Sequence, residues 1–142
     1  MLVRELMSTD VVAVDADRSV RAAVLAMFRA GVGSVIVNRE GVPAGILTET
    51  DALVAAAKTE RPLQDIALES AMTEDLVTGR ADMTVRSAVR RMNEHGVTKL
   101  PITEDFDVVG VLTMTDVVHS HASLIKEAHR AERRSRGRWD PE

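Results

Sequence analysis

The sequence predicts a mixed α/β (α+β) fold. We expect two copies of one β-α-β-β-α unit, related by a pseudo-twofold axis. Two observations predict it. The 142-residue chain repeats itself at a fixed spacing of 65 residues, and each copy alternates short apolar runs with one stretch of helical periodicity. Aromatic residues make up only 2% of the chain, so we expect cores of aliphatic side chains and methionine.

The repeat is found from the two segments that contain Met7 and Met72. Sliding the chain by 65 residues without gaps keeps identical residues on one another through both copies. Met7, Ala23, Gly31, Val32, Gly45, Thr48, Thr50 and Asp51 fall on Met72, Ala88, Gly96, Val97, Gly110, Thr113, Thr115 and Asp116. Two copies of this length favour a pseudo-symmetric pair over a long solenoid.

Each copy has recognisable starts and stops. In the first copy, Ser19 is a candidate N-cap and Gly31 a candidate helix stop, with apolar residues at helical spacing between them. Thr84 and Gly96 take these places in the second copy. The short apolar runs predict strands at 11–14, 34–37 and 44–47, and at 100–102 and 108–112, with a second helix opening at Thr48 and at Thr113.

The chain therefore divides into four segments. We assign residues 1–58 to the first repeat, 59–65 to a linker and 66–121 to the second repeat, and 122–142 to a basic C-terminal helix and tail. Pro62 interrupts the linker, and a single helical turn is expected at 63–66. The helix of the second repeat is expected to extend over 122–132, and the last residues are expected to fray.

The composition excludes several classes of function. The net charge is −4, with 45% apolar and 28% charged residues, which is an ordinary globular balance without a case for a polyanion partner over most of the surface. The absence of cysteine excludes disulfides, thiolate metal sites and cysteine nucleophiles. No apolar run approaches the roughly 20 residues of a membrane span, and no signal-peptide pattern is present, so we expect a cytoplasmic protein without a membrane partner.

The most informative motif runs from Gly45 to Asp51 and again from Gly110 to Asp116. In each, a strand ends, a threonine turns the chain, and a helix begins with an aspartate in its first turn. A helix N-terminus with free N–H groups suits phosphate, and a carboxylate suits a ribose diol. The same spacing also fits a capping box, in which threonine and aspartate close the helix end. Both interpretations remain open at this stage.

Together these residues resemble the CBS domain, twice over, across about residues 1–120. The resemblance implies two clefts that bind an adenosyl ligand, either AMP, ADP, ATP or S-adenosylmethionine, with no other cofactor required. By position it implies ribose binding by Asp51 and Asp116 and phosphate binding by Thr48, Thr50, Thr113 and Thr115. It implies adenine contacts from Val32, Val97, Ala23 and Ala88.

The two copies differ where such proteins carry basic residues for phosphate. Lys99 stands in the second copy, whereas Gly33 and Ser34 stand in the first. We expect Lys99 to contact phosphate, so that one cleft prefers a charged ligand; the alternative is a solvated lysine at a strand edge. The first copy also has Ile36 where the second has Pro101, the residue typical of the family.

The favoured function is a regulatory sensor without catalysis. The sequence has no Ser-His-Asp arrangement and no P-loop, and no metal site is expected because His119 and His121, two apart, point in different directions on a helix. We expect a homodimer through the helical faces at 52–56 and 117–118, and a regulated protein that the sequence does not identify. The alternative is a structural or nucleic-acid-associated adaptor with vestigial clefts, which rests on the arginine-rich tail.

Overall fold

The computed structural model describes the backbone of residues 1–138 and the side chains of residues 1–133. The fraying expected for the end of the tail falls on 139–142 and lies outside the described residues. In the first half the elements are η1 (Val3–Glu5), β1 (Ala13–Asp15), α1 (Val20–Ala30), β2 (Ser34–Arg39), β3 (Val42–Thr48) and α2 (Glu49–Thr59). In the second half they are η2 (Leu63–Asp65), α3 (Leu68–Ala71), β4 (Gly79–Arg80), α4 (Val85–His95), β5 (Lys99–Glu104), β6 (Asp107–Thr113) and α5 (Met114–Arg138).

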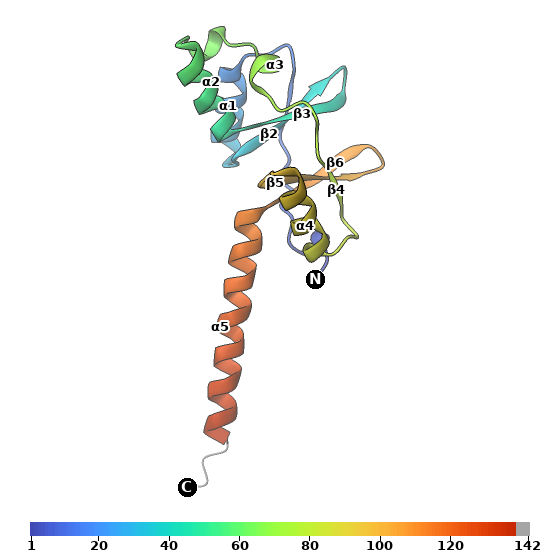
Figure 1. Cartoon of the computed structure of the whole chain (residues 1–142), viewed down its shortest axis with the longest axis vertical. Helices are drawn as coiled ribbons and strands as arrows, with labels where there is room; N and C mark the ends of the chain where they lie inside the picture. The colour runs from blue at the N-terminus through green and yellow to red at the C-terminus, as the bar shows by residue number, and fades with distance from the viewer. Residues whose placement is uncertain (139–142) are drawn as a thin grey trace.

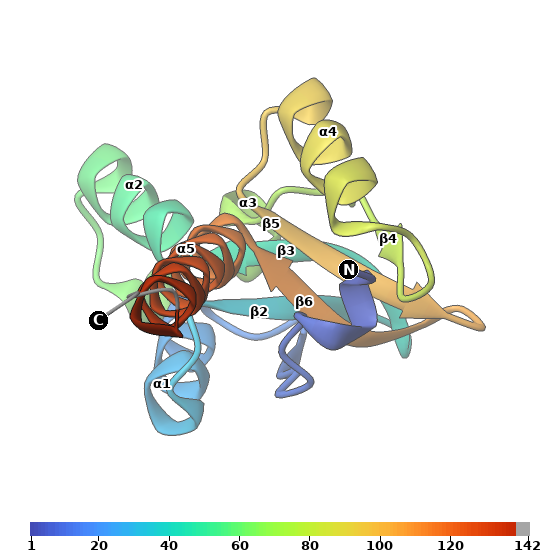
Figure 2. The same ribbon diagram turned by 90° about the horizontal axis from the view of Figure 1, so that it is seen from below.

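The predicted fold class and its duplication are confirmed. Two three-stranded sheets occur, in the orders β1-β2-β3 and β4-β5-β6. In each sheet the first strand pairs parallel to the second, across a helix, and the second pairs antiparallel to the third through a hairpin. The helices lie to one side of their sheets, and the two sheets meet at the centre of the molecule (Figures 1 and 2).

Helices α1 and α4 begin and end at the residues that the sequence indicated. The Ser19 hydroxyl accepts the N–H of Ala22 at 3.2 Å, and the Thr84 hydroxyl accepts the N–H of Ser87 at 3.1 Å. At the other end Gly31 and Gly96 adopt φ values of 68° and 64°, a left-handed conformation that only glycine adopts at little cost. Local side-chain chemistry is sufficient to set these four boundaries.

The first segment of each repeat packs in the core of the other repeat. Val3 is fully buried with Ala88, Met92 and Leu100 of the second half. Its pseudo-equivalent Leu68 is fully buried in the core of the first half. The residues that follow these two segments also pair with the other repeat. Ser8 forms a β-bridge with β6, and Thr73 forms one with β3, so the two repeats exchange their first segments. Each aliphatic core is therefore completed by residues that belong, in sequence, to the other copy.

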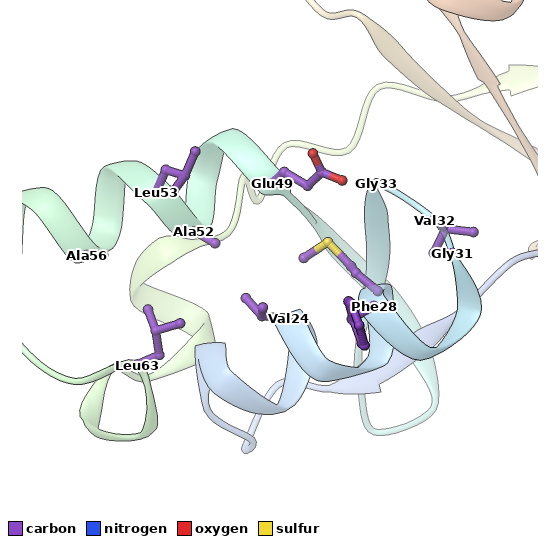
Figure 3. A pocket seen from close by; sticks show the side chains of 11 residues that line it. Val24, Phe28, Gly31, Val32, Gly33, Glu49, Ala52, Leu53, Ala56 and Leu63 are labelled. Atoms are coloured by element: carbon purple, nitrogen blue, oxygen red, sulfur yellow. The ribbon is translucent and has the colours of Figure 1, made fainter.

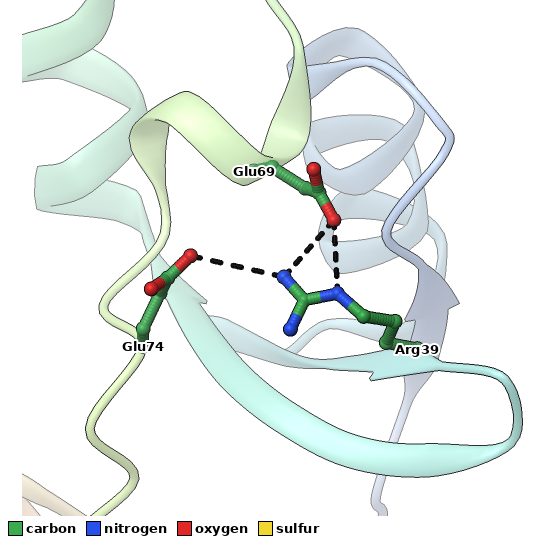
Figure 4. A network of polar contacts seen from close by, with 3 residues as sticks. All are labelled: Arg39, Glu69 and Glu74. Carbon is green, nitrogen blue, oxygen red and sulfur yellow. Dashed lines mark hydrogen bonds and ion pairs between the residues drawn. The ribbon is translucent and has the colours of Figure 1, made fainter.

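A half-exposed ion-pair cluster holds the α3 segment against the first sheet (Figure 4). Arg39, at the end of β2, contacts the Glu69 carboxylate at 3.0 Å and the Glu74 carboxylate at 3.7 Å. The side chains of Arg39 and Glu69 are 49% and 50% exposed, so solvent screening limits the contribution of this cluster to well under about 1 kcal/mol. It reinforces the exchanged segment without determining its position.

Helix α5 projects far beyond the body of the molecule (Figure 1). The expected extension of this helix over 122–132 is found, and the described helix continues to Arg138. Every described side chain from His121 onward is exposed. Among the residues described here, no helix is long and apolar enough to cross a membrane.

Candidate functional site

The two threonine–aspartate motifs form capping boxes at the starts of α2 and α5. The Thr48 N–H donates to the Asp51 carboxylate at 2.9 Å, and the Asp51 N–H donates to the Thr48 hydroxyl at 3.2 Å. The corresponding distances for Thr113 and Asp116 are 3.4 and 3.1 Å. The capping interpretation of the motif is confirmed in both copies.

A cap does not prevent these side chains from binding a ligand. An ionised carboxylate offers about four lone-pair positions, and the cap of Asp51 or Asp116 uses one of them. Both aspartates are half-buried, so the cap holds a partly accessible carboxylate in a fixed orientation at the positive end of a helix. Thr50 and Thr115, one residue before each aspartate, are exposed and make no contribution to either cap.

Lys99 crosses from one repeat to the other. Its ammonium donates to the carbonyl oxygen of Gly33 at 2.6 Å, and its side chain is half-buried. The ammonium is therefore not freely solvated. Lys99 thus holds a cation at the boundary between the two copies.

Lys99 also stands between the two capped helix starts. On the side of the second repeat, its Cα pairs with that of Thr113 in the β5–β6 ladder, next to the start of α5. On the side of the first repeat, the Gly33 carbonyl that it reaches also accepts the N–H of Glu49, the first residue of α2, at 3.2 Å. One ammonium thus connects the neighbourhoods of both threonine–aspartate motifs.

The four residues expected at adenine lie at different depths. Val32 and Val97 follow the helix-ending glycines and are half-buried, so part of each surface is available. Ala23 and Ala88 are fully buried within the two cores. A base could reach these alanines only after the surrounding side chains move. Their small size permits close packing of α1 and α4 on the sheets, and adenine contact by any of the four residues stays a prediction.

An apolar groove between α1 and α2 is the feature that the motifs did not identify (Figure 3). It has a volume of about 750 Å³. Phe28 and Leu53 stand on its rim with 84% and 72% of their surface exposed. Its lining residues are Val24, Met27, Phe28, Gly31, Val32, Gly33, Glu49, Ala52, Leu53, Ala56 and Leu63. The apolar run at 52–56 was a partial signal, but Phe28 and Leu63 join it only through the packing of α1 and the linker.

The histidines do not assemble a metal site. Within residues 1–133, whose side chains are described, no group of three histidine, aspartate or glutamate side chains could hold an ion. His119, His121 and His129 lie along the exposed surface of α5.

Comparison with known proteins agrees with the duplicated architecture. The family model for the CBS domain matches residues 3–58 and again 64–123. An uncharacterized protein of Methanopyrus kandleri is 32% identical over 97 residues, which are 67% of this chain and 50% of that protein. A CBS domain-containing protein of Bacillus subtilis is 28% identical and is covered over 86% of its length. The chain thus spans half of the first relative and most of the second.

Solved structures with the same fold include several that are more than 25% identical in sequence. A conserved protein of Pyrococcus horikoshii has a TM-score of 0.76 at 26% identity, over 84% of this chain and 91% of that one. A CBS-domain protein of Agrobacterium tumefaciens has the same score at 27% identity, over 84% and 92%. A CBS domain pair solved with 5′-methylthioadenosine and S-adenosyl-L-methionine also scores 0.76; at 21% identity it shares the fold, over 87% and 97% of the two chains.

Proposed function

Since this chain belongs to the CBS-domain family and carries the domain twice in tandem, we propose that it is a regulatory module that binds an adenosyl ligand without transforming it. The observation that carries the proposal is Lys99 at the repeat boundary, between two capped aspartates that keep accessible carboxylate surface. The CBS pair solved with 5′-methylthioadenosine and S-adenosylmethionine supports this chemical class of ligand for the fold.

Each part of the ligand has a residue type suited to it. Asp51 and Asp116 accept hydrogen bonds from ribose hydroxyls. The hydroxyls of Thr48, Thr50, Thr113 and Thr115, the helix N-termini and the Lys99 ammonium favour phosphate. Val32 and Val97 offer apolar surface to adenine. Because only the second repeat has a lysine at this position, where the first has Ser34, the two clefts differ, and we propose that AMP, ADP or ATP binds the one that Lys99 serves.

We further propose that the module works as a homodimer. Phe28 and Leu53 expose large apolar surfaces beside the α1–α2 groove, and Val118 on α5 is 58% exposed. Apolar patches of this kind are typical of protein interfaces. A ligand that changes the relation of the two repeats would change this face, and a regulated protein would respond to the change.

Titration calorimetry of the intact chain tests the ligand proposal. AMP, ATP and S-adenosylmethionine are titrated into wild type, Asp51→Ala and Asp116→Ala, after any co-purified nucleotide has been removed. We expect saturable binding to wild type and a loss of at least about tenfold in one or both variants, because a charged hydrogen bond contributes roughly 1.5–3 kcal/mol. Each variant also loses the carboxylate half of its capping box, and some stability with it.

A matched control separates the cap from the ribose contact. Thr48→Ala and Thr113→Ala remove the hydroxyl half of each cap but leave each carboxylate in place. The comparison is made with S-adenosylmethionine, which has no phosphate for the threonine hydroxyls to bind. Equal loss of its affinity in the threonine and aspartate variants would mean that the aspartates act only through the caps. Absence of binding by folded, ligand-free wild type would refute the adenosyl proposal, and chromatography of the bound nucleotide after incubation would expose any turnover.

One observation favours the adaptor as a second candidate. Lys126, His129, Arg130 and Arg133 are exposed and are spaced three and four apart, so that they share one face of α5. Nucleic acid would meet this face through its phosphates. Anisotropy titrations of DNA and RNA duplexes over a salt series test it. Salt-sensitive binding that is lost on truncation before Lys126 would support the adaptor; binding retained after this truncation would refute it.

A further inference from the structure

We propose that Lys99 is a latch between the two repeats. The Gly33 carbonyl and the phosphate of a bound nucleotide compete for its ammonium group. The inference rests on the proposed function and adds to it a determinant of ligand choice. According to this proposal, the hydrogen bond between Lys99 and Gly33 determines how well the protein distinguishes adenosyl ligands with a phosphate from those without one.

The first argument is the contact itself. The Lys99 ammonium and the Gly33 carbonyl are 2.6 Å apart, although 66 positions separate the two residues, and the bond joins the start of β5 to the segment that precedes β2. Backbone bridges also join the two repeats, and they pair Leu2 with Thr84, Ser8 with Val111, Ser19 with Ala67 and Ile46 with Thr73. Lys99 adds to these backbone bridges a connection that is made by a side chain.

The second argument is that the carbonyl is shared. Gly33 accepts the Glu49 N–H at 3.2 Å as well as the Lys99 ammonium. In the second repeat the pseudo-equivalent Thr98 carbonyl accepts the Met114 N–H at 2.9 Å, and Ser34 is the first-repeat counterpart of Lys99. A serine is too short to reach across as lysine does. The backbone hydrogen bond is therefore present in both repeats, whereas the lysine contact is made to Gly33 alone of these two carbonyls.

The third argument is chemical. A neutral carbonyl is a weaker partner for an ammonium than a dianionic phosphate group, because the attraction between opposite charges adds to the hydrogen bond. The lysine side chain has a flexible four-carbon stem, so its head can move without a change in the backbone. A phosphate beside the capped starts of α2 or α5 therefore withdraws the ammonium from Gly33. Adenosyl ligands without phosphate leave the latch closed.

The fourth argument concerns what the latch controls. Gly33 and Glu49 both line the α1–α2 groove, which Figure 3 shows from close by. The oxygen that Lys99 holds is therefore at the rim of the proposed dimer face. Opening of the latch removes a positive charge from the side of Glu49, whose carboxylate points into the same region. Phosphate occupancy is thereby transmitted to the surface that a second copy would cover.

The geometry offers a variant that opens the latch without altering Lys99. A Cβ on Gly33 would lie 2.7 Å from the Lys99 ammonium and 3.2 Å from the Glu49 carboxylate. Both are the ends of flexible side chains, and Gly33 does not have a left-handed conformation. Gly33→Ala should therefore fold and displace the ammonium. Lys99→Met removes the ammonium, and Lys58→Met, on the exposed surface of α2, is the matched control.

The test compares AMP with 5′-methylthioadenosine, which has no phosphate, by calorimetry on the full chain. We expect Lys99→Met to weaken AMP binding by about tenfold, and Gly33→Ala to strengthen it several-fold because the added methyl group keeps the ammonium away from the competing carbonyl. Binding of 5′-methylthioadenosine should change less than about twofold in both variants, as should binding of either ligand in Lys58→Met. Effects of the same sign in Gly33→Ala and Lys99→Met would overturn the latch and leave the adenosyl proposal intact.

A second measurement reports on the contact directly. The carbonyl ¹³C resonance of Gly33 should move in the same direction on addition of AMP and on Lys99→Met, and should stay in place on addition of 5′-methylthioadenosine. A resonance that ignores AMP while AMP binds would overturn the latch. If wild type binds neither ligand, the proposed function fails and the competition fails with it.

Discussion

The sulfur of Met7 lies directly against Gly110, although the two residues belong to different repeats. A Cβ on Gly110 would come within 2.6 Å of this sulfur and within 3.0 Å of the Ser8 carbonyl oxygen. The pseudo-equivalent pair, Met72 and Gly45, has the same relationship, and here a Cβ would meet the Thr73 carbonyl oxygen at 2.6 Å. The glycines of β3 and β6 are therefore required by close approach of the exchanged segments.

Substitution of these glycines by alanine should destabilise the fold unequally. Gly45→Ala meets backbone, which cannot retreat, whereas the closest atom to Gly110→Ala belongs to a flexible methionine. We expect losses of about 3 kcal/mol for Gly45→Ala and about 1–2 kcal/mol for Gly110→Ala in the free energy of unfolding, within the range for overpacked cores. Urea denaturation followed by circular dichroism measures both.

A second substitution in each pair provides the control. Met7→Ala should recover part of the stability lost in Gly110→Ala, since it removes the clashing sulfur. Met72→Ala should recover little in Gly45→Ala, since the Thr73 carbonyl remains. Equal recovery in the two double variants would contradict the assignment of the clash.

The sequence could predict those features that depend on neighbours along the chain. The starts of α1 and α4 at Ser19 and Thr84, and their ends at Gly31 and Gly96, follow from capping chemistry within one helical turn. The repeat spacing identified equivalent positions, because identical residues recur 65 positions apart along the chain. It could not indicate that Met7 and Met72 each pack on the opposite copy, because a repeat shows which residues are alike and not which are in contact.

The candidate site divides along the same line. The Thr48–Asp51 motif was visible as a cap or a ligand site, and the structure establishes the cap. The partner of Lys99 was not visible, because a side chain that reaches 66 positions along the chain leaves no periodic signal. The rim of the groove was missed similarly, since Phe28 joins Leu53 only when α1 packs beside α2.

Because the first segments are exchanged, a substitution in one repeat should lower the stability of the other. Val3→Ala should cost about 2 kcal/mol and Leu68→Ala about 3 kcal/mol, because each opens a cavity in a fully buried position. Native-state hydrogen exchange should accelerate first in α4 and β5 for Val3→Ala, and in α1 and β2 for Leu68→Ala. Acceleration confined to the repeat that contains the substitution in sequence would contradict the exchange of segments.

The groove predicts the surface through which two copies associate. Phe28→Asp and Leu53→Asp each place a charge on an exposed apolar side chain at its rim, so we expect a shift from dimer to monomer with little loss of stability. Analytical ultracentrifugation at several concentrations measures the shift.

Phe106→Asp is the matched control for this experiment. Phe106 is 95% exposed, but it lies at the β5–β6 turn and outside the groove. Association that survives Phe28→Asp and Leu53→Asp, or that is lost equally in Phe106→Asp, would rule out this face.

The β5–β6 turn itself contains a correctable strain. Asp105 and Phe106 both have positive φ, at 49° and 73°, whereas the equivalent turn between β2 and β3 uses Glu40 and Gly41. A two-residue hairpin turn of this hand favours glycine, and a bulky side chain there is strained. Phe106→Gly should therefore stabilise the protein by about 0.5–1 kcal/mol, since the exposed ring contributes little burial. The reciprocal Gly41→Phe should destabilise it by a similar amount in the same urea titration; stabilisation by both would show that burial of the ring, and not backbone strain, governs the turn.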